Sequence, residues 1–386
     1  MPWKETDVDR ERISFVVEAL NRREPMSVLC RRYGISRKTG YKWLKRFRQV
    51  GNLAQLRELS RRPHRSPRRT PERIEQWVER IRLSTGWGGR KISRILAREG
   101  VHLARSTVDQ ILRRRGLIGE VERHRPAVKR FERSRPNKLV QMDFKGQYRL
   151  RNGRECYPLS ILDDHSRFVL GLYALGSQHG QNVKQCLVSC FELYGVPEAM
   201  LMDHGNPWWG TTNGHGLTQL SVFLIRQGIR LHYGGIGHPQ TQGKVERFHR
   251  SLGRAIRYRG IPRSLGRFQA LLEGLRYEYN EIRPHEALGD QVPRSRYQPS
   301  RKPYNARPRP WEYPPGAEVA RVRDNGCLHL EGRYWFVCHA LKGRRVWCQR
   351  FGRRILVTYR HMHVREIDVG AGRTTPVVRP ATRPEV

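Results

Sequence analysis

Residues 138–146 read Lys-Leu-Val-Gln-Met-Asp-Phe-Lys-Gly, and this stretch decides the class of fold. Apolar side chains occupy every second position from Val140 to Phe144, a period that predicts a β-strand. Asp143 then lies on the other face of that strand. A lone carboxylate in the middle of a strand is costly to bury unless it is paired or binds a metal ion. Asp143 is therefore the first candidate for a functional side chain.

Strand and helix patterns alternate downstream of this strand. Strand patterns at 160–162 and 168–174 flank the turn Asp163-Asp-His-Ser-Arg167, so they predict a hairpin. The later patterns predict, in chain order, a helix over 183–191, a strand over 199–202, a helix over 217–225, a strand over 229–233 and a helix from Gly243. This order is typical of ribonuclease-H-like folds, and we expect a mixed sheet with helices.

Two more carboxylates occupy positions suited to a shared site. Asp203 ends the apolar strand over 199–202, and Glu246 lies in the first turn of the helix from Gly243. Glu246 alone is also explained as a capping residue. A pair of hard divalent cations about 3.5–4 Å apart needs converging oxygen ligands, and it clamps both oxygens of an in-line phosphodiester displacement. Asp143, Asp203 and Glu246 are therefore the candidate catalytic and metal-binding residues.

The charge of the chain indicates its partner. Lys and Arg number 75 against 35 Asp and Glu, a net charge of +40 over 386 residues. Such an excess favours nucleic acid, because a polyphosphate is the natural counter-ion. No long apolar segment is present, which argues against a membrane protein. The polar start, Met1–Arg12, does not have the pattern of a signal peptide.

The seven cysteines form no Cys-x-x-Cys pair. Cys186 and Cys190 lie four residues apart in an apolar helical stripe, which predicts reduced core residues. We therefore expect a cytoplasmic, nucleoid-associated protein without structural zinc.

Residues 11–50 have the pattern of a helix-turn-helix. Apolar positions 13, 16, 17 and 20 predict a first helix. Ser27 is the expected N-cap of a second helix over 28–33, which Gly34 closes, and Ser36 is the expected N-cap of a third. The candidate DNA contacts on the third helix are Arg37, Lys38, Tyr41, Lys42 and Lys45. The alternative is a plain three-helix bundle with a solvated basic face.

A second helical trio follows a basic, proline-broken linker. Positions 74, 77, 78 and 81 form its first stripe, and Gly100 ends its second helix. Ser106 with Asp109 predicts a capping-box-like start of the third helix. The candidate DNA contacts there are Arg105, Gln110 and Arg113. Two such modules read a longer site than one, so we expect recognition of a specific double-stranded DNA sequence.

The last part of the chain holds short β-rich runs separated by turn signals, which predict a small β-barrel. The expected fold class is therefore multidomain α+β. The expected divisions are a helix-turn-helix domain over 1–58, a basic linker over 59–70, a second helix-turn-helix domain over 71–120, a basic linker over 121–137, a catalytic core over 138–295, a linker over 296–314, a small β-barrel domain over 315–368 and a disordered tail over 369–386.

Five motifs between about residues 137 and 290 carry a family resemblance. They are Gln141-Met-Asp-Phe-Lys, Leu162-Asp-Asp-His-Ser-Arg-Phe, Asp203-His-Gly-Asn, His238-Pro-Gln-Thr-Gln-Gly-Lys-Val-Glu-Arg and Tyr279-Asn-Glu-Ile-Arg-Pro-His-Glu-Ala-Leu. Together they resemble bacterial insertion-sequence transposases of the DDE superfamily, the branch with a retroviral-integrase-like catalytic core. The paired helix-turn-helix modules and the β-rich end also fit that family.

The resemblance implies a chemistry and its partners. Asp143, Asp203 and Glu246 would hold two Mg²⁺ ions, with Mn²⁺ as a substitute, for cleavage at element ends and strand transfer into target DNA. Lys244 and Arg247 would contact phosphates beside Glu246. The partners would be double-stranded DNA, at the terminal repeats and at the target, and further copies of the chain in a homo-oligomer on DNA. No membrane is expected.

The chain departs from the family pattern in two places, and other functions stay open. Forty-two residues separate Asp203 from Glu246, more than is usual in the family, and we expect the surplus in the loop from Trp208 to Gly216. His204 replaces the usual Asn. Asp163 and Asp164 are expected to be turn residues partnered by Arg167. The alternatives are a catalytically silent, sequence-specific DNA-binding regulator and a ribonuclease-H-like nuclease acting on hybrids.

Overall fold

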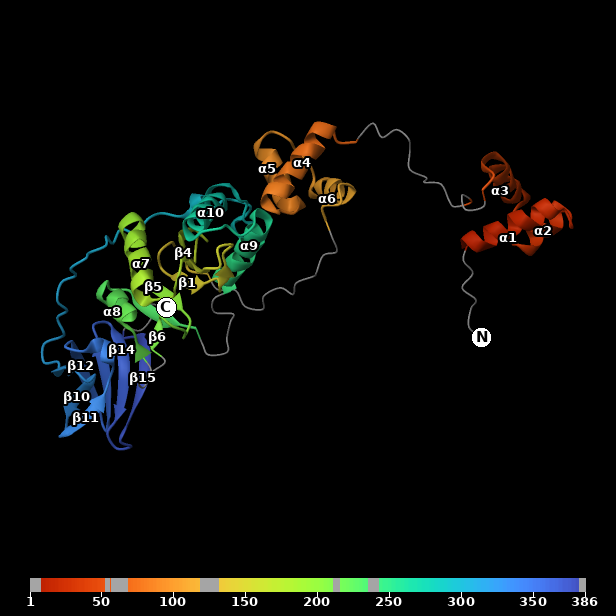
Figure 1. Cartoon of the computed structure of the whole chain (residues 1–386). Coiled ribbons are helices and arrows are strands. Elements are labelled where there is room, and N and C mark those ends of the chain that lie inside the picture. The colour runs from red at the N-terminus through yellow and green to blue at the C-terminus, as the bar shows by residue number, and fades with distance from the viewer. Residues whose placement is uncertain are drawn as a thin grey trace. The chain divides into compact units, whose positions relative to one another are not determined.

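The structure is a computed structural model that describes residues 8–52, 56, 69–118, 132–210, 216–234 and 243–381. The chain forms two compact units, Met1–Thr70 and Pro71–Val386 (Figure 1). Most of the linker expected over 59–70, much of the one expected over 121–137, and the segment of His238 lie outside the described residues. Within the described ranges, no helix is long and apolar enough to cross a membrane.

The first unit contains three helices, α1 (Val8–Asn21), α2 (Met26–Arg32) and α3 (Arg37–Val50). The prediction for α3 is confirmed: the Ser36 hydroxyl accepts a hydrogen bond from the Thr39 N–H at 3.2 Å. The prediction for α2 is wrong in one respect. The helix begins after Pro25, which makes no side-chain cap, so Ser27 lies inside it. Proline is well suited to a helix start because its missing N–H would find no partner there.

A glycine sets how closely α1 and α3 pack. A Cβ atom at Gly40 would lie 2.6 Å from the Cys30 sulfur and 2.8 Å from the Phe15 ring. Both neighbours are almost fully buried, with Trp43 in the same core cluster. Gly40 and Trp43 thus lie on the packed face of α3. On α1 the buried residues are Phe15 and Val16, whereas the predicted stripe members Val17 and Leu20 are exposed.

The second unit begins with the second helical trio, α4 (Glu72–Thr85), α5 (Gly89–Arg98) and α6 (Arg105–Arg114). Its core contains Val78, Ile92 and Ile111. The expected capping box is absent: Ala104 precedes α6 without a side-chain cap, and Asp109 instead pairs with Arg105 at 3.3 Å. A pair one helical turn apart is an alternative use of the same carboxylate.

The central sheet contains every predicted strand in the expected order along the chain, with one short additional strand. Its strands are β1 (Val140–Phe144), β2 (Tyr148–Arg149), β3 (Glu155–Asp163), β4 (Val169–Leu175), β5 (Ala199–Met202) and β8 (Arg230–Tyr233). Strand β3 pairs antiparallel with β1, β2 and β4, and β1, β5 and β8 run parallel. Gln141 lies opposite Leu201 in this register. Two residues further on, Asp143 and Asp203 therefore reach the same edge of the sheet.

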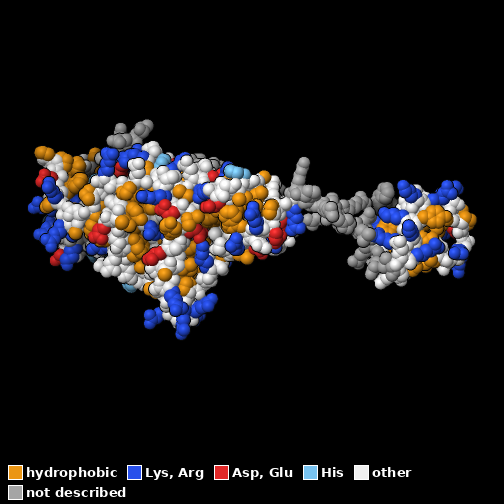
Figure 2. Space-filling model, turned by 90° about the horizontal axis from the view of Figure 1, so that it is seen from above, with side chains coloured by type: hydrophobic (Ala, Val, Ile, Leu, Met, Phe, Trp, Pro, Cys, Tyr) orange, Lys and Arg blue, Asp and Glu red, His pale blue; other side chains and the backbone are white. Residues whose placement is uncertain are grey.

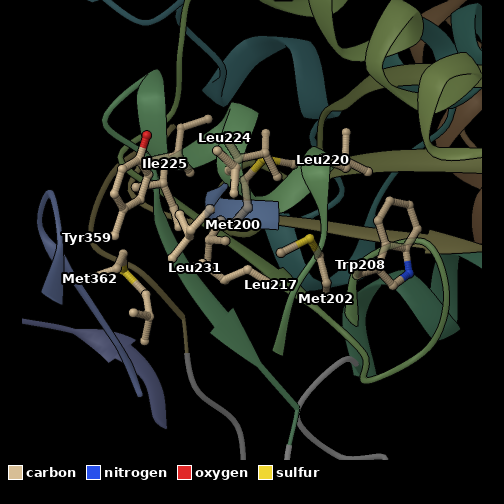
Figure 3. Packing of buried hydrophobic residues seen from close by; sticks show 14 of the residues in the cluster. Met200, Met202, Trp208, Leu217, Leu220, Leu224, Ile225, Leu231, Tyr359 and Met362 are labelled. Carbon is tan, nitrogen blue, oxygen red and sulfur yellow. The ribbon is translucent and has the colours of Figure 1, made fainter. Parts of the chain in front are cut away.

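Helices cover both faces of this sheet (Figure 1). Helices α7 (Gly180–Tyr194) and α8 (Gln219–Arg226) share one apolar cluster with the sheet, and α9 (Gly243–Arg259) and α10 (Leu265–Tyr277) share another. In Figure 3 the α8 side chains Leu224 and Ile225 lie beside Met200 of β5. Short turns follow α10: a π-helical turn at Glu278–Ile282 and 3-10 turns at Glu286–Leu288 and Pro293–Arg296.

The loop after Asp203 is more ordered than its glycine content indicates. Strands β6 (Trp209–Gly210) and β7 (Gly216–Leu217) pair antiparallel around residues 211–215, which lie outside the described residues. The expected loop residue Trp208 is instead 2% exposed and stacks on Phe144 with ring centroids 5.5 Å apart. The loop in which we expect the extra residues between Asp203 and Glu246 thus begins with a core residue, Trp208.

The carboxyl-terminal part forms two antiparallel sheets. The larger has the order β15-β14-β13-β12-β9, and the smaller joins β10 to β11. The strands are β9 (Val319–Arg321), β10 (Cys327–Leu330), β11 (Arg333–Phe336), β12 (Arg345–Phe351), β13 (Arg354–Tyr359), β14 (Met362–Asp368) and β15 (Arg373–Pro380), with a 3-10 turn at His339–Leu341. The predicted barrel is not confirmed, because the described pairing does not join β9 to β15.

The prediction of a disordered tail over 369–386 is wrong over 373–380, which form a strand. Strand β15 (Arg373–Pro380) pairs with β14 along its length and also lies against β8 of the central sheet and against β7. Figure 3 shows Tyr359 and Met362 beside Leu231 of β8. The segment has few large apolar residues, so its order comes from strand pairing and from this contact, which composition does not record.

Candidate active site

Asp143 lies at the sheet edge that Asp203 also reaches, and helix α9 carries Glu246. The Asp143 side chain is 23% exposed. Burial raises its pKa to about 7, and the negative charges of Asp203 and Glu246 contribute to the rise. Mutual repulsion of this kind requires the carboxylates to be close to one another. The structure therefore places Asp203 and Glu246 near enough to Asp143 for their charges to raise its pKa.

Asp203 follows β5 on an exposed turn, and its carboxylate accepts a hydrogen bond from the Gly205 N–H at 3.0 Å. Its neighbour His204 packs against two aromatic rings, with centroid distances of 4.9 Å to Trp209 and 5.4 Å to Tyr233. The residue that replaces the family's Asn thus packs against aromatic side chains.

Glu246 is exposed in the first turn of α9, and the next turn carries a residue that sequence reasoning missed. His249 is buried, and its Nε2 lies 2.9 Å from the Ser160 hydroxyl. Its Nδ1 lies 3.6 Å from an Asp143 oxygen. Burial and the nearby Lys145 lower the His249 pKa to about 3, so the ring is neutral near pH 7. The available signal was its position three residues after Glu246, on the same helix face.

The donor chemistry of the site fits a hard divalent cation, because all three side chains supply carboxylate oxygens. A cation would also relieve the repulsion that raises the Asp143 pKa. In the arrangement observed, no three His, Cys, Asp or Glu side chains of the described residues form a group closed enough to hold an ion. Asp203 and Glu246 are both exposed, so their side chains have room to rotate toward Asp143.

The turn carboxylates are structural, as predicted, but their partners differ from the expectation. Asp163 is fully buried and accepts hydrogen bonds from the Ser166 N–H and hydroxyl and from the Asn137 N–H. Arg167 was expected to pair with an aspartate of the turn. Its guanidinium instead pairs with Glu132 at 2.5 Å and donates to carbonyl oxygens of the turn.

The candidate DNA contacts differ in exposure. The exposed residues are Arg37, Lys38, Tyr41, Lys42 and Lys45 on α3, Arg105, Gln110 and Arg113 on α6, and Arg247 on α9. In Figure 2 the first unit shows many Lys and Arg side chains and little acidic surface. Lys244 is the exception, since its ammonium group lies 2.6 Å from the fully buried Asp164. The prediction that Lys244 is an open phosphate contact is not supported by this geometry.

The second helical trio contacts the core through arginines that the sequence did not single out. Arg90 donates to both Asp290 oxygens at 3.2 Å, and Arg94 donates to the same carboxylate at 3.0 Å. Arg98 donates to the Ile282 carbonyl at 2.8 Å. These contacts leave the outward face of α6 exposed.

Comparison with known families agrees with this architecture. A family model described as "Integrase core domain" matches residues 133–239, and a second model of the same description matches 227–293. A "Helix-turn-helix domain" model matches residues 11–64, and a "Homeodomain-like domain" model matches 39–112. The chain thus joins DNA-binding helical modules to an integrase core, and it is a polynucleotidyl transferase.

Curated relatives narrow this class. The chain is 24% identical over 213 residues to an uncharacterized 31.7 kDa protein of insertion element IS407 from Burkholderia multivorans, covering 54% of this chain and 74% of that protein. It is 26% identical over 188 residues to the transposase for transposon Tn552 from Staphylococcus aureus, covering 41% of this chain and 36% of that protein. Together with the family models, these relatives support an insertion-sequence DDE transposase with an integrase-like core.

Solved structures with detectable similarity include retroviral integrases. A simian T-cell lymphotropic virus intasome matches with a TM-score of 0.38 and 14% identity, over 80% of this chain and 100% of that chain. The HTLV-2 integrase catalytic core domain in complex with magnesium matches with a TM-score of 0.32 and 14% identity, over 42% of this chain and 97% of that chain.

Proposed function

We propose that Asp143, Asp203 and Glu246 hold two Mg²⁺ ions, with Mn²⁺ as a substitute, and that this site cleaves the element's ends and transfers them into target DNA. The observation that carries the proposal is the parallel pairing of β1 with β5, which presents Asp143 and Asp203 at one edge of the sheet. The rise of the Asp143 pKa to about 7, to which both other carboxylates contribute, agrees with it. When bound, the metal pair activates the attacking oxygen and neutralises charge on the leaving oxygen.

The chain's own groups prepare the site for that chemistry. Strands β1 and β5 present Asp143 and Asp203 at one sheet edge, and α9 brings Glu246 over it. The neutral His249 ring, held by Ser160, lies beside Asp143 without adding a positive charge that would compete with a metal ion. Arg247 is exposed next to Glu246 and is suited to bind a DNA phosphate there.

We further propose that the two helical modules recognise the terminal repeats. The side chains for this are Arg37, Lys38, Tyr41, Lys42 and Lys45 on α3 and Arg105, Gln110 and Arg113 on α6, all exposed. The Ser36 cap and the short connection between α2 and α3 support a recognition helix at α3. Joining two ends to one target requires both ends to be held together, so the active form is a homo-oligomer on DNA, associated with the nucleoid.

The proposed domain limits remain those expected from the sequence, with one change. The last domain extends to Pro380, because β15 completes its larger sheet. A closed barrel in this domain would require β9 and β15 to pair, and we do not propose it.

The test is strand transfer by Asp143→Asn, Asp203→Asn and Glu246→Gln. Each change removes one anionic ligand and keeps the side-chain size. We expect cleavage and joining of labelled terminal-repeat duplexes to be lost with Mg²⁺ and with Mn²⁺, and DNA affinity to remain. Near-normal joining by any of the three would remove that residue from the metal site. A silent DNA-binding regulator is not favoured, and it would show no joining even in the wild type.

A further inference from the structure

The start of α9, which carries Glu246, is held to the central sheet by buried polar side chains. The Gln141 amide oxygen accepts a hydrogen bond from the Val245 N–H at 3.2 Å. The Gln141 amide nitrogen donates to Asp164 at 2.9 Å, and the Lys244 ammonium lies 2.6 Å from the same Asp164 oxygen. Both Gln141 and Asp164 are fully buried. We call these three residues, Gln141, Asp164 and Lys244, the α9 clamp.

The α9 clamp connects the strand that carries Asp143 to the helix turn that carries Glu246. Gln141 precedes Asp143 by two residues in β1, so both side chains leave the same face of the strand. Val245, which donates its N–H to Gln141, is the residue before Glu246. A single side chain therefore links the strand of the first carboxylate to the helix turn of the third. Asp164, in the turn after β3, fixes the orientation of the Gln141 amide.

The charges in the clamp do not have a simple packing explanation. Lys244 lies in the first turn of α9, where the helix dipole disfavours a cation. Burial lowers its pKa, and its hydrogen bond to Asp164 opposes that shift. Apolar side chains of similar volume often stabilise a core as well as a buried ion pair does. A retained, hydrogen-bonded pair at this position is better explained by the geometry it imposes on the neighbouring turn.

We propose that the α9 clamp positions Glu246 against Asp143, and that Lys244 is a positioning residue of the active site and not a DNA contact. The proposal rests on the assignment of Glu246 as a metal ligand. Loss of a residue that orients a metal ligand commonly costs about 10- to 100-fold in metal affinity or activity. Loss of a phosphate contact has a different result: it weakens DNA binding and lowers the salt slope of the binding constant by about one.

The experiment compares Lys244→Met with Arg247→Met in the full-length chain. Arg247 is exposed on the same helix turn, so it is the matched control for a phosphate contact. We measure terminal-repeat affinity against salt, the cleavage rate at saturating DNA against Mg²⁺, and Mn²⁺ binding without DNA by electron paramagnetic resonance. For Lys244→Met we expect unchanged DNA affinity and salt slope, an approximately 10- to 100-fold slower cleavage, and weaker Mn²⁺ binding.

Further variants separate positioning from folding. Lys244→Arg keeps the charge and should restore Mn²⁺ binding. The pair Asp164→Asn with Lys244→Met leaves no unpaired buried charge, so it should unfold near the wild-type temperature and still bind Mn²⁺ weakly. In a Glu246→Gln background, Lys244→Met should weaken Mn²⁺ binding no further, because the ligand it positions is already gone.

The outcomes are distinguishable. A lower salt slope and weaker DNA binding for Lys244→Met, with normal Mn²⁺ binding, would make Lys244 a phosphate contact and overturn the proposal. Additive losses of Mn²⁺ binding with Glu246→Gln would also overturn it, since the clamp would then act elsewhere. If Glu246→Gln alone changes neither joining nor Mn²⁺ binding, the underlying ligand assignment fails as well.

Discussion

Replacing Asp143 with Asn should inactivate the site and stabilise the metal-free protein at the same time. The Asp143 pKa is raised from 3.8 to about 7, chiefly by burial and then by Asp203. Above pH 7 the folded protein therefore holds a charge that the unfolded chain accommodates more easily. Each pKa unit corresponds to about 1.4 kcal/mol, so the rise corresponds to at most about 4 kcal/mol, and residual solvent access reduces this value.

The sign of the pH dependence follows from proton binding. Between about pH 4 and pH 7 folded Asp143 keeps a proton that the unfolded chain has lost, so this group makes the protein less stable as the pH rises through that window. Asn carries no titrating proton and resembles the neutral acid. Asp143→Asn should therefore match the wild type near pH 4 and exceed it in free energy of unfolding by up to about 4 kcal/mol at pH 8.

The assay is urea unfolding of both proteins at pH 4.5 and pH 8 in EDTA, repeated at pH 8 with Mg²⁺. A divalent cation stabilises the wild type by binding the folded state, so it should narrow or reverse the gap at pH 8. The reasoning would be refuted if Asp143→Asn were less stable than the wild type at pH 8 without metal. The carboxylate would then have favourable surroundings, and the three acids would not share one site.

Three other predictions concern single residues. Gly40→Ala should destabilise the first unit by about 1–3 kcal/mol, because the new methyl group meets Cys30 and Phe15. The higher helix propensity of alanine offsets part of this loss. Thermal unfolding of the first unit measures the loss of stability, and terminal-repeat binding measures its effect on DNA recognition. Burial lowers the His285 pKa to about 3, so the free energy of unfolding should fall as the pH drops below 6.5. Between pH 7 and pH 5, His285→Gln should lose less free energy of unfolding than the wild type, as measured by urea unfolding. Gln110→Ala should relax base preference at one position of the terminal repeat, at a cost of about 1–3 kcal/mol in binding to the preferred duplex, which footprinting on variant duplexes would detect.

Local patterns predicted the elements that form the active site. The alternation around Asp143, the apolar strand before Asp203 and the helical stripe after Gly243 all correspond to observed elements. Each pattern depends on residues within one or two turns, so the sequence displays it directly. The predictions of helix N-caps were less reliable, as Ser27 and Ser106 show. Several nearby groups compete for the same N–H donors at a helix start.

Pairing between distant segments was not predictable in the same way. Gln141 and Val245 are 104 residues apart, and their hydrogen bond exists only because β1 and α9 meet in the folded sheet. Asp164 was expected to partner Arg167, and the tertiary structure gave it Gln141 and Lys244 instead. Strand β15 is similar, since its order depends on β14 and β8.

The sequence by itself determined the chemistry of this protein: three carboxylates on a predicted strand, strand end and helix start, with basic helical modules before them. Those features are chemical groups at short, regular spacings, and no folding is needed to see them. Only the tertiary structure decided that Lys244 faces Asp164 and not solvent, and that His249 lies beside Asp143. The reason is physical: exposure and partner choice depend on which distant surfaces come together, and burial then decides the charge and freedom of each group.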